Sequence, residues 1–212
     1  MFILNHGLNP NLLTALRKLP RATPREQLVP GDEFEAVLAI ASNRLQLAML
    51  LARDAGLRRA AVETLTQAQV DFDHGEIFGT TKNKARYRVP LTKRLRVLLA
   101  AICPFAGKDE PLIATVSLNR KPVKACTILW ELKRTQERAS AGRGMAWSMH
   151  DLRRTAARQL YDNTRDIRKV QRLLGHASPI ATWWYIGNAG QPLTSEDLEP
   201  KQPQPHEERL LA

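Results

Sequence analysis

Two short stretches of the sequence carry side chains that could bind or attack a phosphate. In MHDLRRT, His150 and Arg153 lie three residues apart near an expected helix start, so both project from one face. A helix N-terminus adds free N–H groups and partial positive charge, which favour an oxyanion. In LLGHASPIATWWYIG, His176 follows the helix-ending Gly175, and Tyr185 comes nine residues later. This tyrosine could act as a nucleophile, with nearby cations stabilising the developing charge.

Two further cations could belong to the same site, although each has an ordinary explanation when taken alone. Arg58 follows a glycine and a leucine in AGLRR, where an arginine also complements a helix dipole. Lys82 lies at the expected tip of a basic hairpin in TTKNKARYRVPL. Likewise, His176 alone could be a capping residue and Tyr185 a core residue. Taken separately, these residues are therefore compatible both with a phosphate site and with ordinary structural roles.

The elements that must position these side chains read as a mainly helical α+β domain with a small antiparallel sheet of two or three strands. Alternation predicts strands near 70–72, 77–80 and 87–91, with a turn at His74-Gly75 and an unusually cationic outer face. Asp32 or Gly31 is expected to cap the first helix. The region 109–125 is too short and mixed for a prediction. Helices are expected over 32–40, 44–55, 92–102, 126–139, 152–161 and 165–174, the last one ended by Gly175.

Composition divides the chain into three parts. Residues 1–31 contain four prolines and predict a short helix near 11–19 followed by a linker. Residues 32–188 contain the helix and strand patterns and form the expected folded domain. Residues 189–212 form an acidic, proline-containing tail that we expect to be disordered.

Bulk properties exclude several classes of protein. The 212 residues are 43% hydrophobic, enough for a packed core, yet no apolar run is long enough to span a membrane. The start lacks the basic region and cleavage site of a signal peptide. Cys103 and Cys126 are the only cysteines, and neither belongs to a CxxC pair. A reducing cytoplasm therefore fits best, with no disulfide framework or cysteine-bound metal.

The net charge of +11 is the strongest bulk signal, and it is unevenly spread. After Ser195 the tail has five acids against two bases, whereas no acid occurs between Glu76 and Asp109. Eight bases fall in that interval. Such a field attracts a polyanion, most often nucleic acid, although a basic solubility surface is the plainer alternative.

Taken in chain order, the motifs resemble the tyrosine recombinase, or phage integrase, family over about residues 32–188. Members carry an arginine in TGLR, a hairpin lysine, HxLRHT, LLGH and then a nucleophilic tyrosine. The resemblance implies that Arg58 and Arg153 hold the scissile phosphate of double-stranded DNA and that Tyr185 attacks it. Lys82, His150 and His176 match the remaining catalytic positions. It also implies a 3′-phosphotyrosyl intermediate that needs no cofactor, ATP or metal.

The resemblance further implies a role in site-specific recombination or integration of a mobile element in the nucleoid. Self-association on DNA, a tetramer in the family, and accessory directionality proteins are the expected partners. A topoisomerase of type IB shares the chemistry and stays open as a variant of this interpretation. Further DNA contacts are expected from the basic residues near the site: Lys84, Arg86, Arg88 and Arg154.

The sequence departs from the family pattern at two site positions and at its front. Ala61 replaces a usual glutamate, and Arg154 replaces the histidine after HxLR. Before the catalytic domain, members carry a helical DNA-binding domain of about a hundred residues, an ordinary domain size. The first 31 residues have room only for its last helix and the linker, which predicts weak, salt-sensitive DNA binding. A non-recombining DNA-binding remnant of an integrase is therefore the alternative function.

Overall fold

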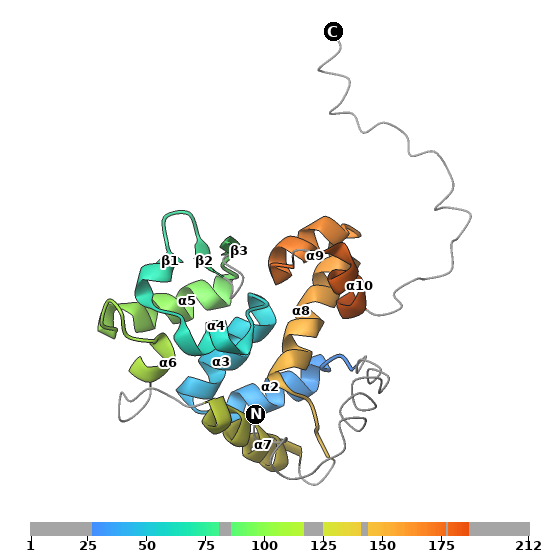
Figure 1. Ribbon diagram of the computed structural model, residues 1–212. Helices are drawn as coiled ribbons and strands as arrows, with labels where there is room; N and C mark the ends of the chain where they lie inside the picture. The colour runs from blue at the N-terminus through green and yellow to red at the C-terminus, as the bar shows by residue number, and fades with distance from the viewer. Residues whose placement is uncertain (1–26, 81–85, 117–124, 141–143, 177, 187–212) are drawn as a thin grey trace, which may run out of the picture.

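The computed structural model describes residues 27–80, 86–116, 125–140, 144–176 and 178–186. Helices dominate these residues, and a small sheet lies at one side (Figure 1). Helix α8 crosses the middle and carries α9 and α10 near its C-terminal end, opposite the sheet (Figure 1). The helices are α2 (Gly31–Ile40), α3 (Asn43–Asp54), α4 (Arg59–Thr64), α5 (Lys93–Ile102), α6 (Leu112–Thr115), α7 (Ala125–Ser140), α8 (Met149–Thr164), α9 (Ile167–Leu174) and α10 (Pro179–Ile186).

Helix α3 forms the centre of the main core. Its sequence NRLQLAMLLARD is apolar on nearly all sides, which is typical of a helix that is buried all round. Seven of its residues are buried, and it packs against α5, α7 and α8. The hydroxyl of Ser42 accepts a hydrogen bond from the N–H of Leu45 and so starts the helix. Helix α8 therefore packs against a deeply buried helix.

The sheet is antiparallel with the order β1-β2-β3, formed by β1 (Val70–Asp71), β2 (Glu76–Thr80) and β3 (Arg86–Pro90). Ile77 pairs with Val89, and both are buried, whereas Arg86 and Arg88 alternate with Val89 and are exposed. The expected small antiparallel sheet of two or three strands is thus confirmed, with three strands, and Arg86 and Arg88 lie on its exposed side.

A second, smaller apolar cluster lies apart from the main core at the C-terminal end of the described chain. It consists of Ala157, Val170, Leu174 and Ile186, with Tyr185 packed against its edge. These residues come from α8, α9 and α10. The helix that carries the tyrosine is therefore held mainly by its two neighbours rather than by the central core.

Several local expectations need correction. Helix α2 begins at Gly31 after Pro30, without a side-chain cap, because Pro30 itself occupies the N-cap position. Helix α9 begins at Ile167, two residues later than expected, because Asp166 caps it. Helix α8 extends three residues beyond the expected range 152–161 at each end, and it starts earlier because Ser148 caps it. Helices α4, α6 and α10 lie outside the predicted ranges. The expected helix near 11–19, the hairpin tip at 81–85 and the tail from 187 onward lie outside the described residues.

Candidate active site

The first turn of α8 is fixed by reciprocal hydrogen bonds at its N-terminus. The hydroxyl of Ser148 accepts from the N–H of Asp151, and the carboxylate of Asp151 accepts from the N–H of Ser148 at 2.8 Å. This capping box places His150 at the second helical position and Arg153 one turn further on. The two side chains that share a face in the sequence therefore project from a well-anchored helix end.

Arg153 joins three segments that are far apart in the chain. Its side chain is buried, with an exposed fraction of 4%. One terminal nitrogen, Nη1, donates to the carbonyl of Gly56, and Nη2 donates to the carbonyl of Leu174 at 2.6 Å. A guanidinium has five N–H donors. The Arg153 side chain also hydrogen-bonds Tyr185, while its buried Nε bonds to no residue in the described part. The fixed guanidinium thus keeps donors available for an anion.

Tyr185 reaches the N-terminus of α8 from α10. Its hydroxyl lies 3.3 Å from Nδ1 of His150. The rings of His150 and His176 lie 5.1 Å and 5.0 Å from the phenol ring, measured between centroids. The guanidinium carbons of Arg153 and Arg154 lie 5.7 Å and 5.8 Å from the same centroid. The phenol is thus surrounded by two imidazoles and two guanidiniums.

The electrostatics of this cluster keep both imidazoles neutral. Desolvation lowers the pKa of His176 to about 4, with the charges of Arg153 and Arg58 acting in the same direction. Desolvation, followed by the charge of Arg154, also lowers the pKa of His150. Burial lowers the pKa of Arg153 to about 10, so this guanidinium stays charged at neutral pH. The site therefore combines permanent cations with neutral hydrogen-bonding rings.

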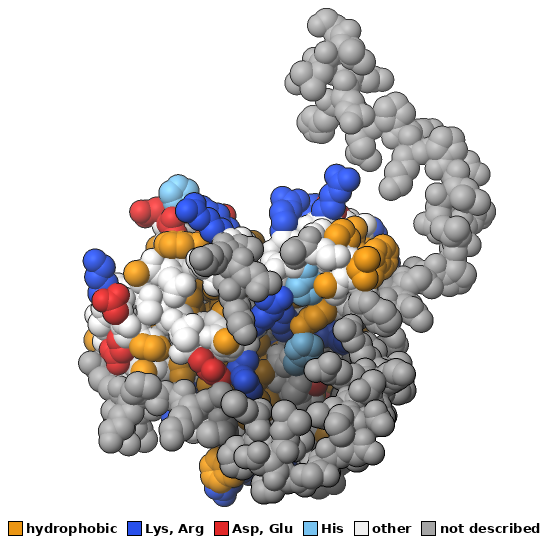
Figure 2. All heavy atoms as spheres, viewed as in Figure 1, with side chains coloured by type: hydrophobic (Ala, Val, Ile, Leu, Met, Phe, Trp, Pro, Cys, Tyr) orange, Lys and Arg blue, Asp and Glu red, His pale blue; other side chains and the backbone are white. Residues whose placement is uncertain are grey.

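A cavity of about 450 Å³ brings the predicted residues together. Arg58, His150, Arg153 and Tyr185 all line it. Arg58 is exposed and occupies the N-cap position of α4, so its charge lies at the cavity mouth. Figure 2 shows Lys/Arg and His side chains gathered near the centre of this face, where α4 meets α8. A phosphate in this cavity would meet cations from two helix starts and a phenol from a third element.

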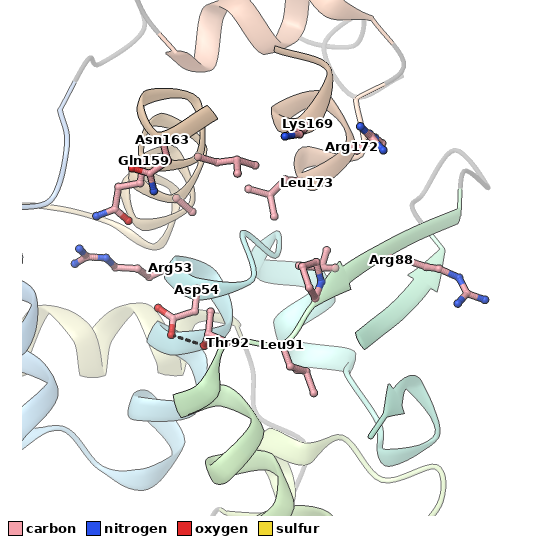
Figure 3. Close-up of a pocket in the computed structure, with 14 residues that line it drawn as sticks. Arg53, Asp54, Arg88, Leu91, Thr92, Gln159, Asn163, Lys169, Arg172 and Leu173 are labelled. Atoms are coloured by element: carbon pink, nitrogen blue, oxygen red, sulfur yellow. Dashed lines mark hydrogen bonds between the residues drawn. The ribbon is translucent and has the colours of Figure 1, made fainter. Parts of the chain in front are cut away.

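Two neighbouring cavities frame this site. One, of about 390 Å³, is lined by Arg58, Arg153 and Ala61, so the small residue at the position of the usual family glutamate borders open space. The other is a larger cleft of about 630 Å³ between β3 and α9, where α8 supplies Gln159 and Asn163 (Figure 3). Its cationic residues are Arg53, Arg88, Lys169 and Arg172. Leu173 lines both of these cavities and so separates them.

The structure brings five of the six predicted catalytic residues to one place. Arg58, His150, Arg153 and Tyr185 share the cavity, and His176 contacts the ring of Tyr185 edge-on. Lys82, like Lys84, lies outside the described residues.

The remaining predicted DNA contacts lie in different environments. Arg86 and Arg88 are exposed on β3, where Arg88 also pairs with Glu76 at 3.1 Å. Arg154 is buried beside the phenol, with an exposed fraction of 5%. Among the residues described, no cluster of histidine, cysteine and acidic side chains could hold a metal ion.

Sequence reasoning missed the groups that hold the candidate catalytic side chains in place. The carbonyls of Gly56 and Leu174 anchor Arg153, and no side-chain pattern marks a backbone acceptor. Thr182 lies 3.2 Å from Nδ1 of His176 and fixes that ring. The capping box could have been found, because Ser148 followed three residues later by Asp151 is its recognised signature.

Comparison with known proteins places this arrangement in a family. Residues 27–191 match the phage integrase family. Tyrosine recombinase XerA of Thermococcus kodakarensis is 30% identical over 172 residues, which cover 80% of this chain and 58% of the relative. Tyrosine recombinase XerC of Lactobacillus delbrueckii is 31% identical over 160 residues, or 73% of this chain and 53% of the relative. The chain thus spans little more than half the length of these relatives.

Solved structures agree on the fold. A crystal structure of XerA recombinase superimposes with a TM-score of 0.64 at 23% identity, covering 85% of this chain and 63% of that one. A lambda integrase tetramer bound to a Holliday junction gives a TM-score of 0.66 at 20% identity, covering 93% and 58%. Among the described residues no helix is long and apolar enough to cross a membrane. The chain belongs to the phage integrase family and has the fold of a tyrosine recombinase catalytic domain.

Proposed function

We propose that this chain cleaves and rejoins DNA strands in site-specific recombination, with Tyr185 as the nucleophile. The observation that carries the proposal is a shared cavity: the phenol, His150, Arg153 and Arg58 all line it. The phenol hydroxyl also lies 3.3 Å from the imidazole that would take its proton. A core tyrosine would need neither the arginines nor the histidine around it.

The arginines would bind the phosphate of the scissile bond. A phosphodiester is anionic and repels an incoming nucleophile. Guanidiniums bind pairs of phosphate oxygens and stabilise the additional charge of the transition state. Arg153 would act through the donors that its two backbone carbonyls leave available, and Arg58 from the cavity mouth. His176, neutral near pH 7, would donate one further hydrogen bond to a phosphate oxygen.

The chemical step is a transesterification. The tyrosine oxygen forms a bond to phosphorus while its proton moves to Nδ1 of His150, whose lowered pKa leaves that lone pair available. The bond from phosphorus to the 5′ oxygen breaks, giving a 3′-phosphotyrosyl ester and a 5′ hydroxyl. The leaving 5′ oxygen takes a proton from a general acid. Lys82, which matches the hairpin lysine of the family, would be that acid. Rejoining reverses these steps and needs no ATP, because one ester replaces another.

The partners follow from the same proposal. The lambda integrase of the compared structure is a tetramer bound to a Holliday junction. We propose that this chain likewise binds duplex DNA and self-associates on it during recombination of a mobile element. The exposed Arg86 and Arg88 on β3 would then contact backbone phosphates beside the cavity. Accessory directionality proteins would add to the assembly.

The test is covalent capture of DNA. The chain is incubated with a pool of nicked duplexes of randomised sequence, whose short 5′ fragment diffuses away after cleavage. Wild type should give a protein–DNA adduct that survives denaturing gels, and sequencing the captured DNA should reveal a preferred site. Tyr185→Phe should give no adduct. Tyr161→Phe, a matched change of a tyrosine on α8, should leave the adduct at the wild-type level.

The other outcomes are equally informative. DNA binding without any adduct from the pool would contradict the proposal and favour a non-recombining remnant. Relaxation of supercoiled plasmids with no site preference would favour a topoisomerase of type IB. An adduct that persists in Tyr185→Phe would exclude this tyrosine as the nucleophile.

A further inference from the structure

A third arginine lies against the nucleophile, and the mechanism above gives it no role. Arg154 follows Arg153 on α8 and is equally buried, with exposed fractions of 5% and 4%. Its guanidinium carbon lies 5.8 Å from the centroid of the Tyr185 ring. Because Arg154 is four residues after His150, the two side chains are neighbours on the helix surface. A permanent charge is therefore placed beside both partners of the proposed proton transfer.

A buried cation at this position must have an effect on its neighbours. Charge interactions strengthen as water is excluded, and a like charge disfavours the protonated form of an imidazole. An arginine over an aromatic face is also attracted by the ring. Both effects act within one turn of α8, on the imidazole and on the phenol.

We propose that Arg154 is a positioning residue for the nucleophile, whose fixed charge holds the Tyr185 ring against α8 and keeps His150 unprotonated at mildly acidic pH. The part that concerns the reaction rests on the function proposed above. The part that concerns His150 stands on the geometry of the free protein. Arg154 would thus extend the pH range in which His150 can accept a proton.

The surroundings of His150 agree with this assignment. Arg153, Arg154 and Asp151 face it from α8, Arg58 from the start of α4 and Tyr185 from α10. Desolvation is the largest cause of its lowered pKa, and Arg154 is the largest charge acting in that direction. Asp151 opposes them, while Arg153 and Arg58 add smaller contributions of the same sign as Arg154. Removing the charge of Arg154 should therefore raise the pKa of His150.

The first test is an NMR titration of the histidine side chains in the free chain, without DNA. Arg154→Met and Arg154→Gln both remove the charge. Met is apolar, whereas Gln keeps hydrogen-bonding groups, so the two variants differ in how they fit the buried site. In both, the titration midpoint of His150 should move to higher pH than in wild type. Arg154→Lys should restore it toward wild type. Arg168→Met, which removes a charge from the exposed face of α9, should leave it unchanged.

A folded Arg154→Met or Arg154→Gln with an unchanged His150 midpoint would overturn the inference. A His150 midpoint in Arg154→Lys that is as high as in the two neutral variants would also overturn it. The second test measures the rate of adduct formation as a function of pH, on the DNA site identified by covalent capture. The ratio of the wild-type rate to the Arg154→Gln rate should grow as the pH falls, whereas a purely structural role would lower the rate equally at every pH. Failure of wild type to form any adduct would refute the proposed function but leave the titration result standing.

Discussion

The two sides of the candidate active-site cavity are held in different ways. On the side of α3, α4 and α8, Leu57 and Leu152 belong to the main core, and Arg153 is fixed by backbone carbonyls. On the side of α9 and α10, Ile186 belongs to the small C-terminal cluster, and Tyr185 only packs against its edge. Arg153, the proposed phosphate ligand, is thus built into the main body, whereas Tyr185, the proposed nucleophile, is carried by a thinly supported helix.

In the proposed mechanism, phosphate binding and nucleophilic attack would therefore depend on different parts of the structure. Cations must be preorganised, because electrostatic stabilisation is strongest when the donors do not reorganise during the reaction. A nucleophile on a helix of its own can be positioned independently. Arg153 is the direct link, since it bonds to Gly56 on one side and to Leu174 on the other.

The largest expected effect is at Arg153. We expect Arg153→Ala to lower the rate of adduct formation by about 10²–10³-fold, the usual cost of removing a transition-state donor. It should also destabilise the protein by about 1–3 kcal/mol, because a buried carbonyl loses its partner. Arg58→Ala should lower the rate by a similar factor yet leave stability nearly unchanged, since Arg58 is exposed. Rates come from covalent capture and stabilities from urea unfolding.

The contrast between these two arginines is what matters. Equal losses of stability in Arg153→Ala and Arg58→Ala would show that Arg153 does not join the two sides of the cavity. Arg172→Ala, an exposed arginine on α9, is the control for the loss of one positive charge. It should leave stability at the wild-type level.

Truncation in the two apolar clusters should have separable consequences. Leu51→Ala, in the fully buried centre of α3, should cost about 2–5 kcal/mol of global stability. Ile186→Ala should instead loosen α10 locally, because the small cluster can open without the main core. Hydrogen exchange should then quicken in residues 179–186 while the main transition stays close to that of wild type, and adduct formation should fall. Equal global destabilisation by both variants would contradict two separate units.

How far the sequence predicted this site depended on the kind of group involved. His150, Arg153, His176 and Tyr185 were identifiable because side-chain type and spacing carry the signal. Helix α4 was missed because RAAVET is one short turn-and-a-half that follows Gly56-Leu57-Arg58 without a long periodic pattern.

Contacts between residues far apart in the chain had no local signature in the sequence. The environment of Arg154 depends on where α10 lies, and the anchoring of Arg153 depends on two carbonyls 97 and 21 residues away in the chain. Exposure of a cation on a basic helix is the default expectation from sequence alone. Only the packing of α8 against its neighbours makes these two arginines buried, and that packing involves contacts with no sequence pattern of their own.

A smaller effect is expected at Gly56, whose carbonyl accepts from Arg153. Its φ of 60° is left-handed, and an added Cβ would lie 3.1 Å from Leu173. Gly56→Ala should therefore cost about 1–2 kcal/mol for the backbone conformation alone, with further crowding of α9. Gly144→Ala has a similar φ of 70° but meets no atom within 4 Å. The difference in thermal stability between the two variants measures the cost of crowding against Leu173. Equal losses of stability would mean that the Leu173 side chain moves aside at no cost.

The smallest expected effect is the pH dependence contributed by His176. Its pKa is lowered from 6.5 to about 4 in the folded chain, so between these values the unfolded chain binds more protons. Stability should therefore be fully present above pH 6.5 and decline as the pH falls toward 4. His176→Gln cannot take up that proton, so its urea midpoint should decline less steeply over the same interval. The lowered pKa of His150 leaves some decline in both proteins.

Because the charges of Arg58 and Arg153 reinforce the desolvation at His176, Arg58→Ala should also flatten the decline partially. Parallel curves for wild type and His176→Gln would mean that the imidazole is solvated, and that the side of the cavity formed by α9 and α10 does not exclude water.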